Sequence, residues 1–205
     1  MPRVKQVKAR KDYPDHGVKK GDMCYVWSVK TGPRSSRNYR QLTPPKPHQL
    51  TSSAFLGTAY ELNERIEALT ADDLEDELQE IIDEIQELGD EQDEKWNNMP
   101  ESLQYSSTGE LLEGRRDSCE EWFSNLESVK DNLPERPTWT VVELPDEPEE
   151  PDSADFAAPE HYDAAMIKWE EEQCKWEEEK DEAEAYESEL QSQLEEAQGY
   201  LYEGE

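Results

Sequence analysis

Hydrophobic side chains recur at helical spacing from about residue 51 onward. One row steps by four and three residues and consists of Phe55, Ala59, Leu62, Ile66 and Leu69. This alternation places the side chains along one face of a helix, and it predicts a helix that packs against a neighbour. Thr51, Ser52 and Ser53 directly precede the row, and their hydroxyl groups are suited to cap the helix N-terminus.

A second row follows after a change of register. It consists of Leu74, Leu78, Ile81, Ile85 and Leu88. Because residues 70–73 have capping-box character, we expect a kink or short turn between the two rows. A third row follows the polar loop that runs from Asn97 to Gly109, and consists of Leu112, Arg115, Cys119, Trp122, Leu126, Val129 and Leu133. The rows predict an acidic antiparallel helical hairpin over residues 51–133.

Before residue 51 the pattern changes to alternation. Tyr25, Trp27 and Val29 occupy every second position, which places them on one face of a strand. Residues 31–36 supply turn chemistry before a second short run from Arg37 to Leu42, so we predict a β-hairpin. Prolines in the segment 43–47 fix an extended connector. Residues 1–50 are therefore expected to form a small basic β-hairpin module with a Pro-rich connector.

The chain after residue 133 divides into a linker and a helix. Residues 134–160 contain six prolines and many acids, which indicates a linker in which the short run Trp139–Val142 could dock as a single strand. Residues 161–205 return to heptad spacing, with Trp169 and Trp176 on one stripe. Because Gln, Lys and Glu interrupt this row, we expect an acidic coiled-coil-like helix that forms against a partner or a second copy. The two tryptophans are then the self-association residues of a homodimer.

The predicted elements define an α+β fold class that is mainly α: a small basic β-hairpin module, an acidic antiparallel helical hairpin and a long C-terminal helix. Only 33% of residues are hydrophobic, so we expect thin helical layers. The basic start of the chain has no apolar stretch behind it, and no 18 uncharged apolar residues follow one another, which predicts a cytosolic protein without membrane insertion. Cys24, Cys119 and Cys174 are odd in number and are expected to be reduced packing residues.

Charge is divided between the two ends of the chain. Residues 1–50 carry twelve Lys and Arg against three Asp and Glu, whereas residues 51–205 carry nine against forty-nine. The two parts have net charges of +9 and −40, which give the total of −31. The larger part should repel nucleic acid and anionic membranes and attract cationic protein grooves. This polarity points to a binding protein.

Sequence signals for catalysis, cofactors and metals are missing. The chain has no phosphate-binding Gly-rich loop, no Cys-x-x-Cys, no His-Glu-x-x-His and no calcium loop. His16, Cys24 and His48 could gather one metal ion, but they lack close ligand pairs and equally fit a surface His, a core Cys and a loop His. We therefore predict no enzyme, no cofactor and no metal site.

The second helix of the predicted hairpin carries dense negative charge. Residues 72–94 hold thirteen acids and no base, roughly one negative charge per 2.7 Å of helix, against about one per 1.7 Å along duplex DNA. Residues 170–189 add eleven acids and two lysines, and two such helices side by side could occupy the phosphate-binding groove of another protein, as DNA does. The alternative is a solvated, soluble exterior. The candidate partner-binding residues are Asp72, Asp73, Glu75, Asp76, Glu80, Asp83, Glu84, Glu87, Asp90 and Glu91.

The basic module suggests the opposite kind of partner. Its candidate nucleic-acid contacts are Arg34, Arg37, Arg40, Lys19 and Lys20, which are interleaved with aromatic side chains. The acidic part of the same chain competes with nucleic acid at high effective concentration. We therefore expect the module to fold back onto acidic helices of its own or a neighbouring chain, and do not expect direct nucleic-acid binding.

Several segments of the chain resemble a known family. Ala9–Pro14, Lys19–Asp22, Thr31–Arg37 and Thr43–Thr51 read ARKDYP, KKGD, TGPRSSR and TPPKPHQLT. With Asn98–Pro100 and Thr108–Leu112, they are similar to uncharacterised proteins encoded by tailed bacteriophages and prophages, over about residues 8–130. The resemblance implies a phage origin and the host cytoplasm, and it carries no activity and no functional residues.

The sequence therefore predicts a non-enzymatic phage accessory protein. Its acidic, DNA-mimicking helices would bind and inhibit a host defence or DNA-processing protein that has a basic nucleic-acid-binding groove. Two alternatives stay open. One is a nucleic-acid-binding adaptor that uses the basic module, and the other is a scaffolding protein that assembles through helix pairing.

Overall fold

The computed structural model describes residues 2–32, 34–152, 154 and 158–203. The chain is α+β and mainly helical, so the expected fold class is confirmed. Its elements are β1 (Lys5–Lys8), η1 (Pro14–His16), β2 (Met23–Gly32), β3 (Ser35–Gln41), η2 (Pro47–Leu50), α1 (Ala54–Ala68), α2 (Leu74–Asn97), α3 (Glu101–Gln104), α4 (Ser107–Asp131) and α5 (Pro159–Gly199). Pro33 of the expected turn, residues 153 and 155–157 of the expected linker and residues 204–205 lie outside the described part.

A three-stranded antiparallel sheet in the order β1-β2-β3 forms the N-terminal module. The expected hairpin corresponds to β2 and β3, in which Trp27 pairs with Tyr39. Strand β1 was not expected, because Lys5–Lys8 contains one apolar residue and shows no alternation. The strand forms by pairing with the start of β2, which is distant in the sequence; Val7, for example, lies opposite Cys24.

The two faces of this sheet have different neighbours. On one face the rings of Trp27 and Tyr39 stack with centroids 5.6 Å apart, and Trp27 Nε1 donates a hydrogen bond to the Gln49 carbonyl. The other face is covered by a small cluster around the buried residues Ala9, Val18 and Cys24. Because both faces are partly covered, the short strands are held in one register.

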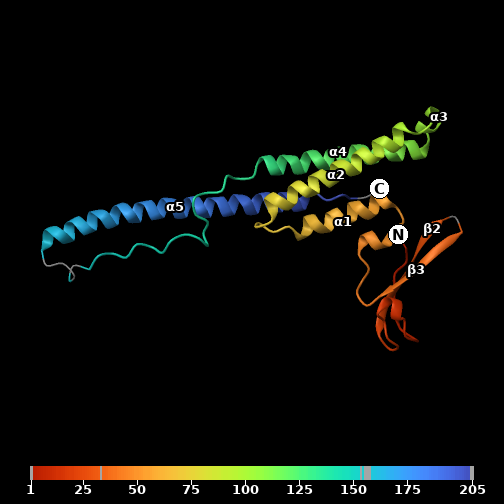
Figure 1. Ribbon diagram of the computed structural model, residues 1–205, viewed down its shortest axis with the longest axis horizontal. Coiled ribbons are helices and arrows are strands. Elements are labelled where there is room, and N and C mark those ends of the chain that lie inside the picture. The colour runs from red at the N-terminus through yellow and green to blue at the C-terminus, as the bar shows by residue number, and fades with distance from the viewer. Residues whose placement is uncertain (1, 33, 153, 155–157, 204–205) are drawn as a thin grey trace.

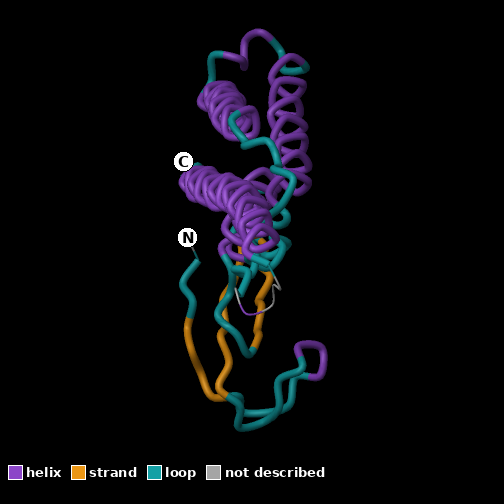
Figure 2. The backbone as a smooth tube through the Cα atoms, turned by 90° about the vertical axis from the view of Figure 1, so that its left-hand side faces the viewer, coloured by secondary structure: helices purple, strands orange, loops and turns teal. Residues whose placement is uncertain are grey.

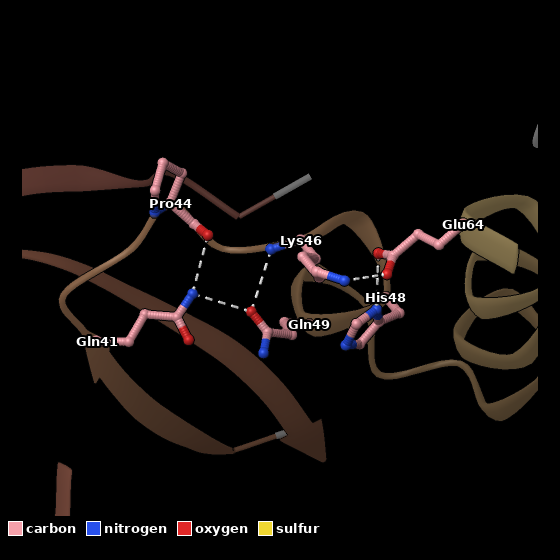
Figure 3. A network of polar contacts seen from close by, with 6 residues as sticks. All are labelled: Gln41, Pro44, Lys46, His48, Gln49 and Glu64. Atoms are coloured by element: carbon pink, nitrogen blue, oxygen red, sulfur yellow. Dashed lines mark hydrogen bonds and ion pairs between the residues drawn. The ribbon is translucent and has the colours of Figure 1, made fainter. Parts of the chain in front are cut away.

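A polar network fixes the module to the helical part (Figure 3). Gln41 Nε2 donates to the Pro44 carbonyl and to Gln49 Oε1, which also accepts from the Lys46 backbone N–H. Lys46 Nζ lies 2.5 Å and His48 Nδ1 3.1 Å from the two carboxylate oxygens of Glu64 on α1. The Pro-rich connector is therefore attached at both of its ends.

Helices α1 and α2 are separate, with the break between residues 69 and 73 where the hydrophobic row changes register. Ser53 caps α1, since its Oγ accepts a hydrogen bond from the Leu56 backbone N–H. Leu69 follows the last residue of α1 and is buried, as is Leu74 at the start of α2. The apolar rows therefore continue into the core on both sides of the turn.

Helices α2 and α4 pack as an antiparallel pair, with the short α3 at its tip (Figures 1 and 2). The pair buries Leu78, Ile81 and Ile85 from α2 against Trp122 and Leu126 from α4. Gly89 permits a close approach, because a Cβ at this position would lie 3.1 Å from the Cβ of Cys119. The predicted helical hairpin is therefore formed by α2 and α4, and α1 packs beside it.

The 41-residue helix α5 joins this core only at its C-terminal end. Leu194 and Ala197 are buried in the main hydrophobic cluster, and Leu190 packs against it. The N-terminal part of α5 projects away from the helical core, with the linker running beside it (Figure 1). Within the linker, Trp139–Val142 forms no strand, because Thr140 begins a turn in which the Glu143 backbone N–H donates to its carbonyl.

Candidate functional site

Eight of the ten predicted acidic residues lie on the packed helix α2, and Asp72 and Asp73 lie in the turn before it. The opposite face of α2 is buried against α1 and α4, including Leu78, Ile81 and Ile85. All ten predicted acids are exposed. Five of them step by four and three residues along α2 and therefore form one line on its outward face, roughly 5 Å apart along the helix axis. These are Asp76, Glu80, Asp83, Glu87 and Asp90, and we call them the α2 acidic row.

Three of the ten predicted acids are paired with bases of the same chain. Arg65 of α1 lies within 3.4 Å of Glu80 and 2.5 Å of Glu84, and Lys95 lies 2.8 Å from Glu91. Burial opposes the charge of Arg65, but its hydrogen bonds to Glu84 and Glu77 outweigh this effect and raise the pKa of the guanidinium. Arg65 therefore neutralises one edge of α2.

The other seven acids form no ion pair among the described residues. They are Asp72, Asp73, Glu75, Asp76, Asp83, Glu87 and Asp90. Two of them accept hydrogen bonds from neutral neighbours, Asp73 from Thr70 Oγ1 and Asp83 from Gln79 Nε2. These bonds hold the side chains without removing their charge, so four of the five members of the α2 acidic row, all except Glu80, remain available to a cationic partner.

The pairing by Arg65 was missed at the level of the sequence. Arg65 is the only base between residues 51 and 94, which is a signal that could have singled it out. Its partners Glu77, Glu80 and Glu84 follow from how α1 and α2 lie side by side, which spacing along one helix does not reveal. A similar contact joins Arg116 of α4 to Asp93 of α2 at 3.5 Å.

The predicted basic contacts do not form one surface. Arg37 and Arg40 lie three residues apart on β3, and successive side chains of a strand point to opposite faces. Arg40 lies over the ring of Tyr13, with its guanidinium carbon 3.5 Å from the ring centroid. Lys19 and Lys20 lie in the loop before β2 and are exposed. Arg34 is exposed at the β2–β3 turn.

A shallow basic pocket lies beside Arg40. It is lined by Val7, Lys8, Ala9, Arg10, Tyr13 and Arg40. Three of these side chains are cations, none is an acid, and Tyr13 adds an aromatic surface. Lys11 Nζ lies 5.4 Å from the centroid of the same ring. The pocket therefore offers positive charge to an anionic ligand, while Arg40 already covers one face of the Tyr13 ring.

Self-neutralisation of the module was expected from the sequence and is present only at its edge. Lys46 and His48 contact Glu64, and these are the module's ion pairs with helix acids within the described ranges. The other cations of the module make no ion pair there. The basic side chains of the sheet are therefore separated from the acidic helices of the same molecule.

Trp169 and Trp176 contact the linker. Trp169 Nε1 donates to the Pro148 carbonyl at 3.1 Å, and Trp176 Nε1 donates to the Pro145 carbonyl at 2.7 Å. The two side chains predicted to mediate self-association are thus engaged within the chain. This contact was missed because the linker gave no periodic hydrophobic signal.

The described residues offer no cluster for metal binding, and of the three free cysteines Cys24 and Cys119 are buried as expected, whereas Cys174 is exposed. No group of three or more His, Cys, Asp and Glu residues among them could hold a metal ion, so His16, Cys24 and His48 form no such group. Burial raises the pKa of the Cys119 thiol to about 11, and Arg115 opposes this only in part. Cys119 is therefore protonated near neutral pH and is a poor nucleophile.

Comparisons with known proteins do not place the chain in a family. No family model matches the chain, and neither a curated protein nor a solved structure matches it. Over the described residues, no helix is both long and apolar enough to cross a membrane. The charged surfaces are therefore the features from which a function is inferred.

Proposed function

We propose that this chain is a non-enzymatic binding protein that blocks a host nucleic-acid-handling protein through its acidic helices. The α2 acidic row would occupy a basic groove that otherwise holds the phosphates of DNA. The resemblance noted in the sequence suggests a phage accessory protein that acts against host defence or DNA processing in the host cytoplasm. The partner is then a cationic nuclease, polymerase or nucleoid protein.

The observation that carries this proposal is the rigid display of carboxylates. The helix α2 is held by buried contacts with α1 and α4 along one face, while the α2 acidic row lies on the opposite face. A flexible acidic tail would lose conformational entropy on binding, whereas a packed helix has already lost it. Fixed charges on a packed helix therefore favour a specific partner more than a mobile polyanion does.

The test is to neutralise four acids of the row that have no ion pair. We expect the combination Asp76→Asn, Asp83→Asn, Glu87→Gln and Asp90→Asn to lower the affinity for a captured host protein by more than about 100-fold. Host proteins are captured at low salt, eluted with salt and identified. The affinity of the purified partner is then measured by calorimetry for both forms of the chain. The wild-type chain should also compete with DNA for this partner.

A matched control removes the same charge from the projecting helix. Glu171, Glu178, Glu182 and Glu187 of α5 are exposed and can be replaced by Gln. This variant should keep its affinity within a few-fold at the same net charge. Equal loss in both variants would mean that only bulk charge matters, and the proposal would be abandoned.

A second candidate function is nucleic-acid binding by the basic module. It is favoured by one observation: the cations around Tyr13 make no ion pair with the acidic helices among the described residues. The quadruple α2 variant separates the two candidates. A labelled DNA duplex should bind this variant at least as tightly as the wild type if the module is the binding surface, and should bind neither protein if it is not.

A further inference from the structure

Two tryptophans of α5 hold two carbonyls of the linker. Trp176 Nε1 donates to the carbonyl of Pro145, and Trp169 Nε1 donates to that of Pro148. The linker and α5 run antiparallel, because the tryptophan later in the sequence bonds to the proline that comes earlier. In Figure 1 the linker follows α5 back along its projecting part. We call residues 143–152 the strap.

The sequence of the strap determines its conformation. Proline restricts its own φ to about −65°, and it also pushes the preceding residue into the extended region. Pro145, Pro148 and Pro151 are three residues apart, and together with the residues before them they account for six of the eight positions 144–151. These positions all favour polyproline II, a helix of three residues per turn in which the three prolines lie on one side.

The axial repeats of the strap and of α5 differ by only about 1.2 Å. Three residues of polyproline II rise about 9.3 Å, and seven residues of an α-helix rise about 10.5 Å. Over the two repeats that separate the three prolines the mismatch reaches only about 2.4 Å, so prolines spaced by three can face aromatic residues spaced by seven over this length. The aromatic series is Tyr162, Trp169 and Trp176, and continuing the observed register places Tyr162 opposite Pro151. Both of these residues are half-buried.

Ion pairing does not explain this contact. The strap and the part of α5 beside it are both strongly acidic, so their charges repel each other. The contacts are instead hydrogen bonds from neutral donors on α5: the two indole N–H groups donate to proline carbonyls, and Gln173 Nε2 donates to Glu147 Oε1 at 3.1 Å. Lys180 lies 5.2 Å from the Trp176 ring centroid and closes one end of the aromatic row. Aromatic rings with indole donors are the usual means by which proteins bind proline-rich segments.

We propose that the Trp169–Trp176 face of α5 is a binding site for proline-rich segments in the polyproline II conformation, and that the strap is its resident ligand. A short tether gives the strap an effective concentration of order millimolar, so it excludes the same segment of a second copy at ordinary protein concentrations. The face is therefore closed to self-association while the strap is bound. When the strap loses its conformation, the face becomes free to bind a strap in trans.

The experiment opens the site without shortening the chain. In the variant Pro145→Gly, Pro148→Gly the strap keeps its length and its acids but loses two conformational constraints. The probe is a synthetic peptide of residues 143–152, and binding is followed by the indole N–H resonances of Trp169 and Trp176 in NMR spectra. We expect the variant to bind the peptide and the wild type to show at least tenfold weaker binding, because its site is filled.

Two controls keep the outcome decisive. A peptide with glycine in place of all three prolines has the same charge and should bind the variant at least tenfold more weakly. Equal binding of the two peptides would overturn the proposal. In the wild-type protein itself, the indole N–H groups of Trp169 and Trp176 should exchange with solvent at least tenfold more slowly than that of Trp139, which is 38% exposed. Exchange at one common rate would also overturn it.

Discussion

At the scale of single residues, Glu64 joins the two parts of the molecule. Its carboxylate accepts from Lys46 and lies 3.1 Å from His48 Nδ1. Partial burial raises the pKa of Glu64, but the bonds to Lys46 and His48 outweigh this and lower it below the ordinary value of 4.5. A lowered pKa means that the ionised carboxylate stabilises the fold above pH 4.5, and that this contribution is lost as the pH falls through the lowered value.

We therefore expect Glu64→Gln to lower the free energy of unfolding by about 1 kcal/mol at pH 7 and by much less at pH 3. The measurement is urea unfolding followed by circular dichroism at both pH values. Glu61→Gln is the matched control, because Glu61 lies on the same helix and is exposed. It should change the free energy by less than about 0.5 kcal/mol at either pH. A difference for Glu64→Gln that does not depend on pH would contradict the assignment.

At the scale of elements, two glycines of α4 have opposite roles. A Cβ at Gly109 would overlap the backbone carbonyl of Gln104, which is the last residue of α3. A Cβ at Gly114 would meet no atom within 4 Å. We expect Gly109→Ala to destabilise the fold by about 1–3 kcal/mol, and Gly114→Ala to stabilise it by about 0.5–1 kcal/mol. Urea unfolding checks both, and equal shifts would show that the turn between α3 and α4 adapts freely.

Some of these elements could be predicted from the sequence and others could not. Rows such as Phe55–Leu69 could be predicted as helices, because a periodic apolar face is a local property of the chain. Strand β1 could not be, since the residues Lys5–Lys8 acquire a partner only from β2. In the candidate site, the exposure of the acidic residues could be predicted from the same periodicity. The ion pairs of Arg65 could not be predicted in this way, because they depend on how α1 and α2 lie side by side.

At the scale of the whole molecule, opposite charges are kept apart by architecture. The sheet with its basic side chains lies near one end of the molecule, and α5 with the strap extends to the other end (Figure 1). The α2–α4 pair reaches toward the same end as the sheet, and α1 lies between the pair and the sheet in the view of Figure 1. Beyond a Debye length of about 8 Å, exposed charges are largely screened at physiological salt. Wherever the two kinds of surface lie further apart than this, they can act on different partners without neutralising each other.

The C-terminal segment, residues 200–202, bonds to both α1 and α4. Asn63 of α1 donates from Nδ2 to the Tyr202 carbonyl at 2.9 Å and accepts from the Tyr202 backbone N–H at 2.8 Å. Trp122 of α4 donates to the Tyr200 carbonyl, so the segment joins two helices that are far apart in the sequence. We expect Asn63→Ala to lower the free energy of unfolding by about 1–3 kcal/mol, because both partly buried bonds are lost.

Asn63→Asp sharpens this prediction. The carboxylate can still accept a hydrogen bond from the Tyr202 N–H, but it has no donor for the Tyr202 carbonyl and places a negative charge beside it. The free energy of unfolding should therefore fall at least as much as for Asn63→Ala. Ser192→Ala is the control, because Ser192 is exposed on α5 near the same end. Hydrogen exchange then distinguishes closure of the whole fold from a local effect. Since Tyr202 packs against both Phe55 and Trp122, both Asn63 variants should speed exchange in α1 and α4 together, whereas faster exchange in α1 alone would confine the segment to a local role.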